Sequence, residues 1–213
     1  MIRLTAAVLV TIVALCALVS AQDKAPKAVE KLPVSYGLVV DNSGSFRMLL
    51  DRVITVAADV VDENGADDET FLVTFVDTPK IALRQEFTYR KSELHDAAQN
   101  MFIEGGQTAI LDAVKSAADY LSENARRDDG RLRALVLITD GEDRGSVSKI
   151  DDVLKLLKEQ NIRVFVIAMT DTKVFTKIID RLAKDTGGSV VVSKVRADLP
   201  AAVKLVTAQM RTR

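Results

Sequence analysis

Four nearly continuous apolar runs, separated by segments with apolar residues at helical spacing, constrain the fold of this chain more than any other feature. The runs cover residues 34–40, 70–76, 132–138 and 162–168. Runs without regular polar alternation are typical of parallel strands that are buried on both faces. Because helical segments lie between them, the sequence predicts an α/β fold, with a doubly wound, mostly parallel central sheet and helices on both faces.

Shorter segments complete the predicted sheet and its helices. Residues 81–83 follow a Thr-Pro turn and are expected to form one short antiparallel edge strand, and residues 190–192 a last short strand. Met48 and Met169 are expected to fill gaps in the core. Helices are predicted over residues 49–63, 92–101, 109–121, 150–160, 173–184 and 201–209.

The first strand runs directly into a loop rich in oxygen donors, Asp41-Asn42-Ser43-Gly44-Ser45. Asn42 and Gly44 favour a tight turn. The carboxylate of Asp41 and the hydroxyls of Ser43 and Ser45 alternate with these turn residues and can converge on one point. Hard oxygen donors of this kind are the ligands that Mg²⁺, Mn²⁺ and Ca²⁺ prefer. Our hypothesis is that this loop forms part of a site for a divalent cation.

Two further segments are expected at the same edge of the sheet. Asp140 closely follows the third apolar run, and ligands bind at the carboxyl ends of strands in such sheets. Two carboxylates held close repel each other, and a cation between Asp41 and Asp140 would remove that cost. Thr108 follows a glycine-rich loop just before a predicted helix. Its hydroxyl is either a further metal ligand or a helix cap, and the spacing favours neither.

Together, the three segments resemble the von Willebrand factor A (VWA) domain family. Asp41-Asn42-Ser43-Gly44-Ser45 matches the D-x-S-x-S motif of that family, and Thr108 and Asp140 match its other two motif elements in order and spacing. The resemblance covers about residues 33–213 and is greatest to the bacterial exported members. It implies the Rossmann-like VWA fold.

The resemblance also implies a function. In VWA domains the five motif residues form a metal-ion-dependent adhesion site (MIDAS), so Asp41, Ser43, Ser45, Thr108 and Asp140 are the expected metal residues here. The hydroxyls would approach the cation, and the aspartates would act directly or through bound water. An acidic residue of a partner protein would complete the open coordination shell. The expected cation is Mg²⁺, which retains exchangeable waters, and Mn²⁺ and Ca²⁺ are alternatives.

Charge balance and motif content argue against other functions. The chain of 213 residues has 29 Lys and Arg against 30 Asp and Glu, which disfavours a nucleic-acid surface. No Gly-Lys-Ser/Thr phosphate loop occurs, and the single histidine, His95, has no readable nucleophile partner. We therefore expect no enzymatic activity. The alternatives are a metal-stabilised structural domain of an envelope assembly and a metal-dependent phosphohydrolase.

The N-terminal residues indicate export. Arg3 precedes an uncharged, apolar stretch that ends in Val19-Ser20-Ala21, the layout of a secretory signal peptide over residues 1–21. An uncleaved membrane anchor is the alternative. Cleavage removes Cys16, the only cysteine, so the mature chain would form no disulfide. We predict a flexible leader over residues 22–33, a VWA domain over residues 34–213, and a periplasmic or secreted location in the bacterial envelope.

Overall fold

The computed structural model describes residues 32–127, 130–171 and 173–212. The predicted signal peptide, residues 1–21, lies outside this part of the chain, as does the predicted leader apart from its last two residues. Among the described residues, no helix has both the length and the apolar character needed to span a bilayer.

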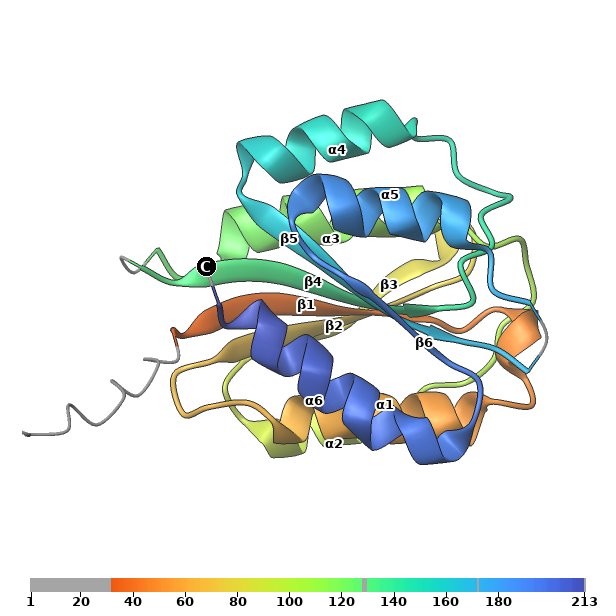
Figure 1. The fold of residues 1–213 in the computed structure, drawn as a ribbon, viewed down its shortest axis with the longest axis horizontal. Coiled ribbons are helices and arrows are strands. Elements are labelled where there is room, and N and C mark those ends of the chain that lie inside the picture. Colours follow the sequence, from red (N-terminus) through yellow and green to blue (C-terminus); the bar gives the residue numbers. More distant parts are fainter. Residues whose placement is uncertain (1–31, 128–129, 172, 213) are drawn as a thin grey trace, which may run out of the picture. The chain divides into compact units, whose positions relative to one another are not determined.

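The described residues form one mixed sheet. Its strands are β1 (Val34–Asp41), β2 (Glu69–Phe75), β3 (Ile81–Thr88), β4 (Leu132–Thr139), β5 (Ile162–Met169) and β6 (Val190–Ser193). The spatial order is β3-β2-β1-β4-β5-β6 (Figure 1). All neighbouring pairs are parallel except β2 and β3. The predicted fold class, with an antiparallel strand at one edge, is therefore confirmed.

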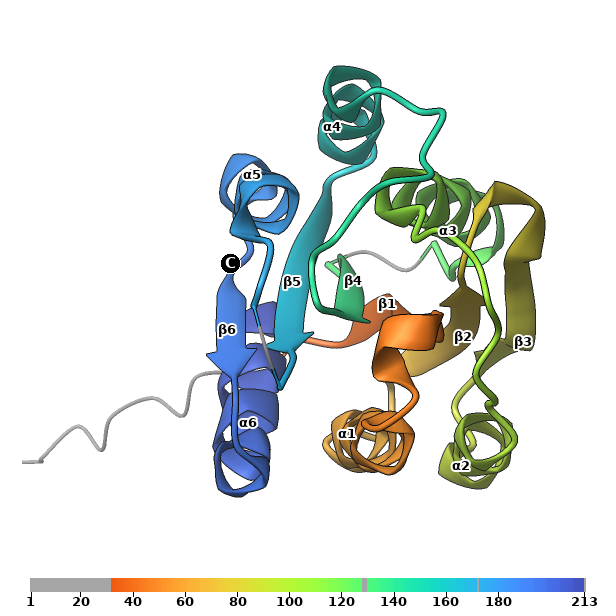
Figure 2. The same cartoon turned by 90° about the vertical axis from the view of Figure 1, so that its right-hand side faces the viewer.

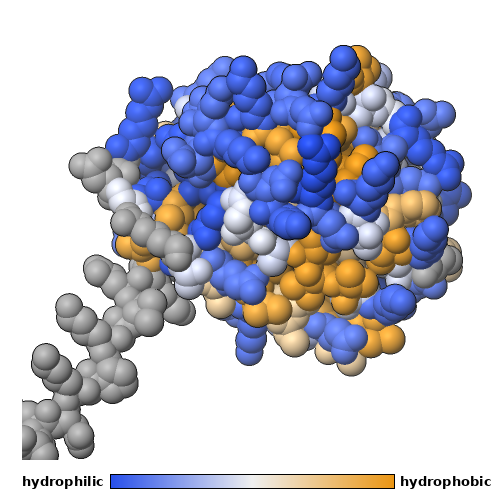
Figure 3. Space-filling model, turned by 45° about the horizontal axis from the view of Figure 1, so that its top comes forward, coloured by the Kyte–Doolittle hydropathy of each residue, from blue (hydrophilic) through white to orange (hydrophobic). Residues whose placement is uncertain are grey.

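Helices cover both faces of this sheet (Figures 1 and 2). One face carries α1 (Leu50–Asp62), α2 (Lys91–Gln99) and α6 (Leu199–Met210), and the other carries α3 (Ile110–Asn124), α4 (Ile150–Glu159) and α5 (Thr176–Thr186). Three short 3₁₀ turns are η1 (Gly44–Phe46), η2 (Thr78–Lys80) and η3 (Arg196–Asp198). Figure 3 brings the α4 side forward and shows mostly hydrophilic side chains with apolar areas between them.

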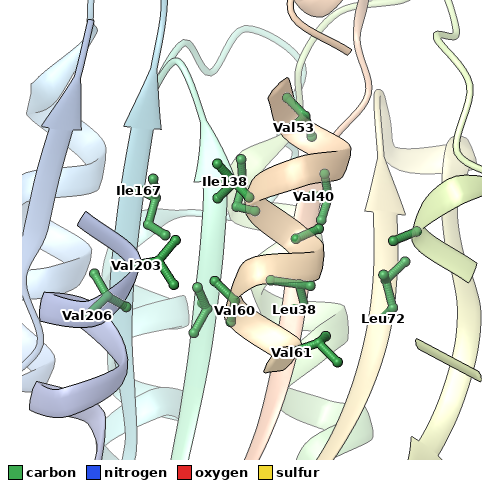
Figure 4. Close-up of a cluster of buried hydrophobic side chains, with 14 of the residues drawn as sticks. Leu38, Val40, Val53, Val60, Val61, Leu72, Ile138, Ile167, Val203 and Val206 are labelled. Atoms are coloured by element: carbon green, nitrogen blue, oxygen red, sulfur yellow. The ribbon is translucent and has the colours of Figure 1, made fainter. Parts of the chain in front are cut away.

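Each face of the sheet packs against its helices through an apolar cluster. On one face, Leu38, Ile138 and Ile167 from the strands meet Val60 of α1 and Val203 of α6 (Figure 4). Every residue of β1 is buried, as expected for a central strand that is covered on both faces. Full burial of one such aliphatic side chain contributes about 1.5–3 kcal/mol, so these clusters are the main source of stability. They hold the strand ends, and the loops that follow them, in fixed positions.

Three details of the sequence prediction are wrong. Strand β3 has 8 residues rather than the predicted 81–83, because an edge strand tolerates the exposed polar side chains that concealed it in the sequence. The helix predicted over residues 173–184 begins only at Thr176. Met48 was expected in the core but is 85% exposed, whereas Met169 is buried as predicted.

A buried ion pair fixes the C-terminal end of α6 to the segment that precedes β2. The Arg211 guanidinium contacts the Asp68 carboxylate, and both side chains are more than nine-tenths buried. Arg211 also donates to the backbone carbonyl of Glu63 at 3.0 Å. Asp68 accepts hydrogen bonds from the backbone N–H groups of Val34 and Gly65, each at 2.8 Å. The pair therefore joins the C-terminal helix to the start of β1.

Removal of this arginine should destabilise the fold strongly. Arg211→Met would leave the Asp68 carboxylate buried without its cation, which typically costs about 3–5 kcal/mol. Chemical denaturation should show a loss of that size. The matched control is Arg196→Met, because Arg196 is exposed in η3; we expect a change within about 0.5 kcal/mol. Similar small losses for both variants would contradict a structural role for the ion pair.

Candidate metal centre

Asp41 ends β1 at the point where the strand order reverses. β1 lies between β2 and β4: β2 and β3 are added to the sheet on one side of β1, and β4, β5 and β6 on the other. Doubly wound sheets bind their ligands at such a reversal of strand order. The Asp41 carboxylate is fully buried. It accepts hydrogen bonds from the Ser43 N–H at 3.0 Å and from the Thr139 hydroxyl at 2.9 Å. These bonds fix its orientation at the carboxyl edge of the sheet.

The environment of Asp41 disfavours its ionised form. Burial raises the pKa of Asp41 from 3.8 to about 7, hydrogen bonds from Ser43 and Thr139 oppose the rise, and the nearby charge of Asp140 adds to it. The negative charge of Asp140 therefore also disfavours ionisation of Asp41, although burial is the larger cause. A cation beside them would offset both the burial and the repulsion.

Three hydroxyl groups from two loops meet beside this carboxylate. Ser43 Oγ and Ser45 Oγ are 3.1 Å apart, and Thr108 Oγ1 donates to Ser43 Oγ at 3.3 Å. Thr108 makes no cap bond, because the N-cap residue of α3 is Ala109. Ser43 and Thr108 are buried, whereas Ser45 is exposed. The cluster thus opens toward solvent on the Ser45 side.

The loop that carries Thr108 is tied to the ends of two strands. Asn42, the first turn residue after β1, accepts a hydrogen bond from the Glu104 N–H at 2.9 Å. Its side-chain amide donates to the carbonyl of Phe102 at 2.9 Å. The Ala109 N–H donates to the carbonyl of Val76, just beyond β2, at 2.7 Å. These three bonds explain how residues distant in the sequence reach one site.

Asp140 follows β4 at the same edge of the sheet. The β1–β4 register pairs Val40 with Ile138, which brings the two strand ends level. The Asp140 carboxylate accepts a hydrogen bond from the Glu142 N–H at 3.0 Å, and the residue is only 7% exposed. Its backbone carbonyl accepts a hydrogen bond from the Phe175 N–H at 2.9 Å. Figure 2 looks onto this edge, where the loops after β1 and β4 face the viewer.

The β4–α4 loop and the start of α3 hold each other through reciprocal hydrogen bonds. Asp143 accepts a bond from the Ile110 N–H at 3.0 Å, and Ser146 Oγ accepts one from the Leu111 N–H at 3.0 Å. The Thr108 carbonyl accepts two bonds from this loop, both at 2.9 Å. Asp143 and Ser146 therefore bind backbone N–H groups in the first turn of α3, although both lie in a different loop.

Asp112 completes this connection and was missed by the sequence analysis. It accepts hydrogen bonds from the Val147 N–H at 2.9 Å and the Ser148 N–H at 2.8 Å, and a further one from the Thr78 hydroxyl. Burial alone would raise the pKa of Asp112, but the bonds from Ser148, Thr78 and Val147 lower it to about 2. In the sequence Asp112 is an ordinary first-turn acid of a helix, so no local signal marks it.

The donor set at this edge fits a hard divalent cation. It comprises two carboxylates and three hydroxyls. The described ranges contain no cluster of three or more His, Cys, Asp or Glu side chains that could hold a metal ion. Soft metals prefer thiolate or imidazole, whereas carboxylate and hydroxyl oxygens suit Mg²⁺, Mn²⁺ or Ca²⁺. The structure therefore links four of the predicted residues by hydrogen bonds through Ser43, which contacts Asp41, Ser45 and Thr108. The charge of Asp140 lies near enough to affect Asp41.

The raised pKa of Asp41 predicts an unusual pH dependence of stability. Without metal, the folded protein keeps the Asp41 proton up to about pH 7, whereas the unfolded chain releases it near 3.8. The metal-free fold therefore loses stability as the pH rises between these values. Asp41→Asn cannot ionise. In EDTA, the stability of the wild type relative to this variant should fall between about pH 4 and about pH 7 and then level off.

Saturating Mg²⁺ should reverse this trend for the wild type, because the cation binds only the ionised carboxylate. Chemical denaturation of both proteins at several pH values measures the difference. Identical pH profiles of the wild type and Asp41→Asn, with and without Mg²⁺, would contradict the description of this site.

Solved structures of bacterial proteins share the fold. An aerotolerance-related membrane protein from Bacteroides fragilis NCTC 9343, with multiple mutations to serines, superposes with a TM-score of 0.68 at 19% identity, covering 83% of this chain and 98% of that one. The conserved hypothetical protein BatB from Bacteroides thetaiotaomicron gives a TM-score of 0.67 at 18% identity, covering 84% and 100%. A von Willebrand factor type A structure from Catenulispora acidiphila gives 0.71 at 13% identity, covering 84% and 43%.

The sequence comparison identifies the family. No curated protein matches this chain. The von Willebrand factor type A domain family matches residues 37–203, which extend from within β1 into the first part of α6 and include all five predicted metal residues. Domains of this family commonly bind a divalent cation. The chain therefore belongs to the von Willebrand factor type A domain family.

Proposed function

We propose that this domain binds a protein partner through a divalent cation held by Asp41, Ser43, Ser45, Thr108 and Asp140. The observation that carries the proposal is the fully buried Asp41 carboxylate, which lies near the charge of Asp140 and beside a hydrogen-bonded cluster of three hydroxyls. Such a carboxylate is costly to ionise unless a cation is present. Together these residues form the complete adhesion site of the family.

The opening at Ser45 supports a role for the cation in binding another molecule. Ser45 is exposed, while Asp41, Ser43 and Thr108 are buried. A cation held here would contact the protein on its buried side and water on the other. Mg²⁺ keeps near-octahedral oxygen geometry and retains several waters, so an acidic side chain of a partner can replace one of them. Mn²⁺ and Ca²⁺ are the alternative cations.

A binding role is favoured over catalysis. An enzyme needs a nucleophile or a general base near the reacting atoms, with a second group that orients it. His95 lies in α2 and contacts Asp62 at the C-terminal end of α1, with 2.9 Å between Nε2 and Oδ1. Because α1 starts just after the metal loop, its other end lies at the opposite edge of the sheet. Our proposal is therefore a non-enzymatic, adhesive site.

The proposed location is the bacterial envelope. Two of the similar structures come from Bacteroides, and one of them is described as an aerotolerance-related membrane protein. Residues 1–21 carry the pattern of a signal peptide. We propose that the protein is exported and acts in the periplasm or outside the cell, where Mg²⁺ and Ca²⁺ are accessible.

Substitution of the buried carboxylate tests the function directly. Asp41→Ala should lower the Mg²⁺ affinity at least about 100-fold, measured by calorimetric titration, because it removes a predicted ligand of the cation. Pull-down from the native envelope should recover a partner with wild-type protein in Mg²⁺ and lose it in EDTA or with Asp41→Ala. Asp51→Ala, which changes an exposed carboxylate in the first turn of α1, is the matched control and should retain both activities.

Two other results would reject the proposal. Capture of the same partner by Asp41→Ala in EDTA would show that partner binding does not require the cation. A large loss of melting temperature on chelation, with no metal-dependent partner recovered, would favour the alternative of a metal-stabilised structural domain.

A further inference from the structure

We propose that a groove beside the metal centre receives a segment of the partner that is acidic and carries an apolar side chain. This inference rests on the proposed function, because the same partner would supply the carboxylate to the cation. The groove lies between the β4–α4 loop and the segment that leads into α5, at the edge of the sheet seen in Figure 2.

The groove begins at Gly141, the residue that follows Asp140 of the predicted metal site. It has a volume of about 440 Å³ and is lined by residues 141–144 on one side and 173–178 on the other. The hydrogen bond from the Phe175 N–H to the Asp140 carbonyl joins its two walls. Gly141 has a φ of +85°, and a Cβ there would lie 2.1 Å from the Phe175 carbonyl oxygen. Only glycine allows the backbone at position 141 to lie this close to Phe175. The groove therefore begins one residue after Asp140.

The uncompensated charge along this groove is positive. Lys173 and Lys177 are exposed, and neither has a carboxylate partner among the described residues. Of the two acids on the other wall, only Glu142 has a cationic partner among the described residues. Glu142 pairs with Arg144 at 2.6 Å, and Asp143 accepts bonds from the start of α3. The two lysines therefore favour a partner segment with acidic residues, beyond the one that reaches the cation.

Exposed apolar side chains lie in loops around the same centre. Phe175 in the groove is 37% exposed, and Lys173 Nζ lies 5.4 Å from the centroid of its ring. Met48, in the loop after β1, is 85% exposed, and Phe102, in the loop before α3, is 52% exposed. Of these three side chains, Phe175 belongs to the groove itself. A segment with an apolar residue near its acids would cover Phe175 while its acids meet the lysines.

A selection from random peptides tests the chemistry of this partner. The probe is a displayed library of random peptides of about 12 residues, which reach about 40 Å when extended. The library is bound to the wild-type protein in Mg²⁺ and eluted with EDTA. We expect enriched peptides with several acidic residues and at least one Leu or aromatic residue. Neutral or basic enriched peptides, or no enrichment over Asp41→Ala, would overturn the proposal.

Charge reversal in the groove provides the second measurement. An enriched peptide should bind Lys173→Glu/Lys177→Glu at least about 10-fold more weakly than the wild type in Mg²⁺. The control is Lys158→Glu/Lys204→Glu, which makes the same charge change at exposed positions of α4 and α6. The control should bind within about 2-fold of the wild type. Melting curves verify that both variants fold, since all four lysines are exposed.

The failures of the two proposals are distinguishable. Peptides that stay bound in EDTA and bind Asp41→Ala equally well would reject the metal-dependent function. Peptides that need Mg²⁺ and Asp41 but bind the Lys173→Glu/Lys177→Glu variant as tightly as the wild type would reject only the groove as their docking site.

Discussion

The candidate metal centre of this domain depends on one electrostatic constraint, the burial of the Asp41 carboxylate at the point where the strand order of the sheet reverses. The surrounding core removes water from the carboxylate, and Asp140 adds a second negative charge nearby. Hydrogen bonds from Ser43 and Thr139 orient the group but leave its pKa raised to about 7. A bound cation would stabilise the ionised form of this carboxylate. The packing of the sheet, which buries Asp41, is in this way connected to the proposed function.

The loops around this carboxylate are fixed by hydrogen bonds between loops rather than by regular secondary structure. Asp112 and Asp143 connect the β4–α4 loop to the start of α3 in both directions. Asn42 connects the loop after β1 to the segment before α3. As a result, Thr108 and Asp140 have fixed positions although neither lies inside a helix or strand. The same connections leave the groove beside Gly141 and the exposed ring of Phe175 facing outward.

The fold class followed from the sequence because the strands are continuous apolar runs, which only a sheet covered on both faces can bury. The motif residues could be found because their spacing matches a known family. The partly exposed strand β3, the exposed Met48 and the capping roles of Asp112, Asp143 and Ser146 could not be predicted. Each depends on contacts between segments distant in the chain, and local propensity carries no information about them.

The most direct test of the proposed cation site is crystallography of the domain with Mn²⁺, using the anomalous signal of the metal. We predict a single strong peak at the carboxyl edge of the sheet, with the hydroxyl oxygens of Ser43, Ser45 and Thr108 within about 2.5 Å of the ion. Asp41 and Asp140 should lie beside it, in direct contact or through water. No peak there at saturating Mn²⁺, or a peak bound by other residues, would contradict the assignment of this site.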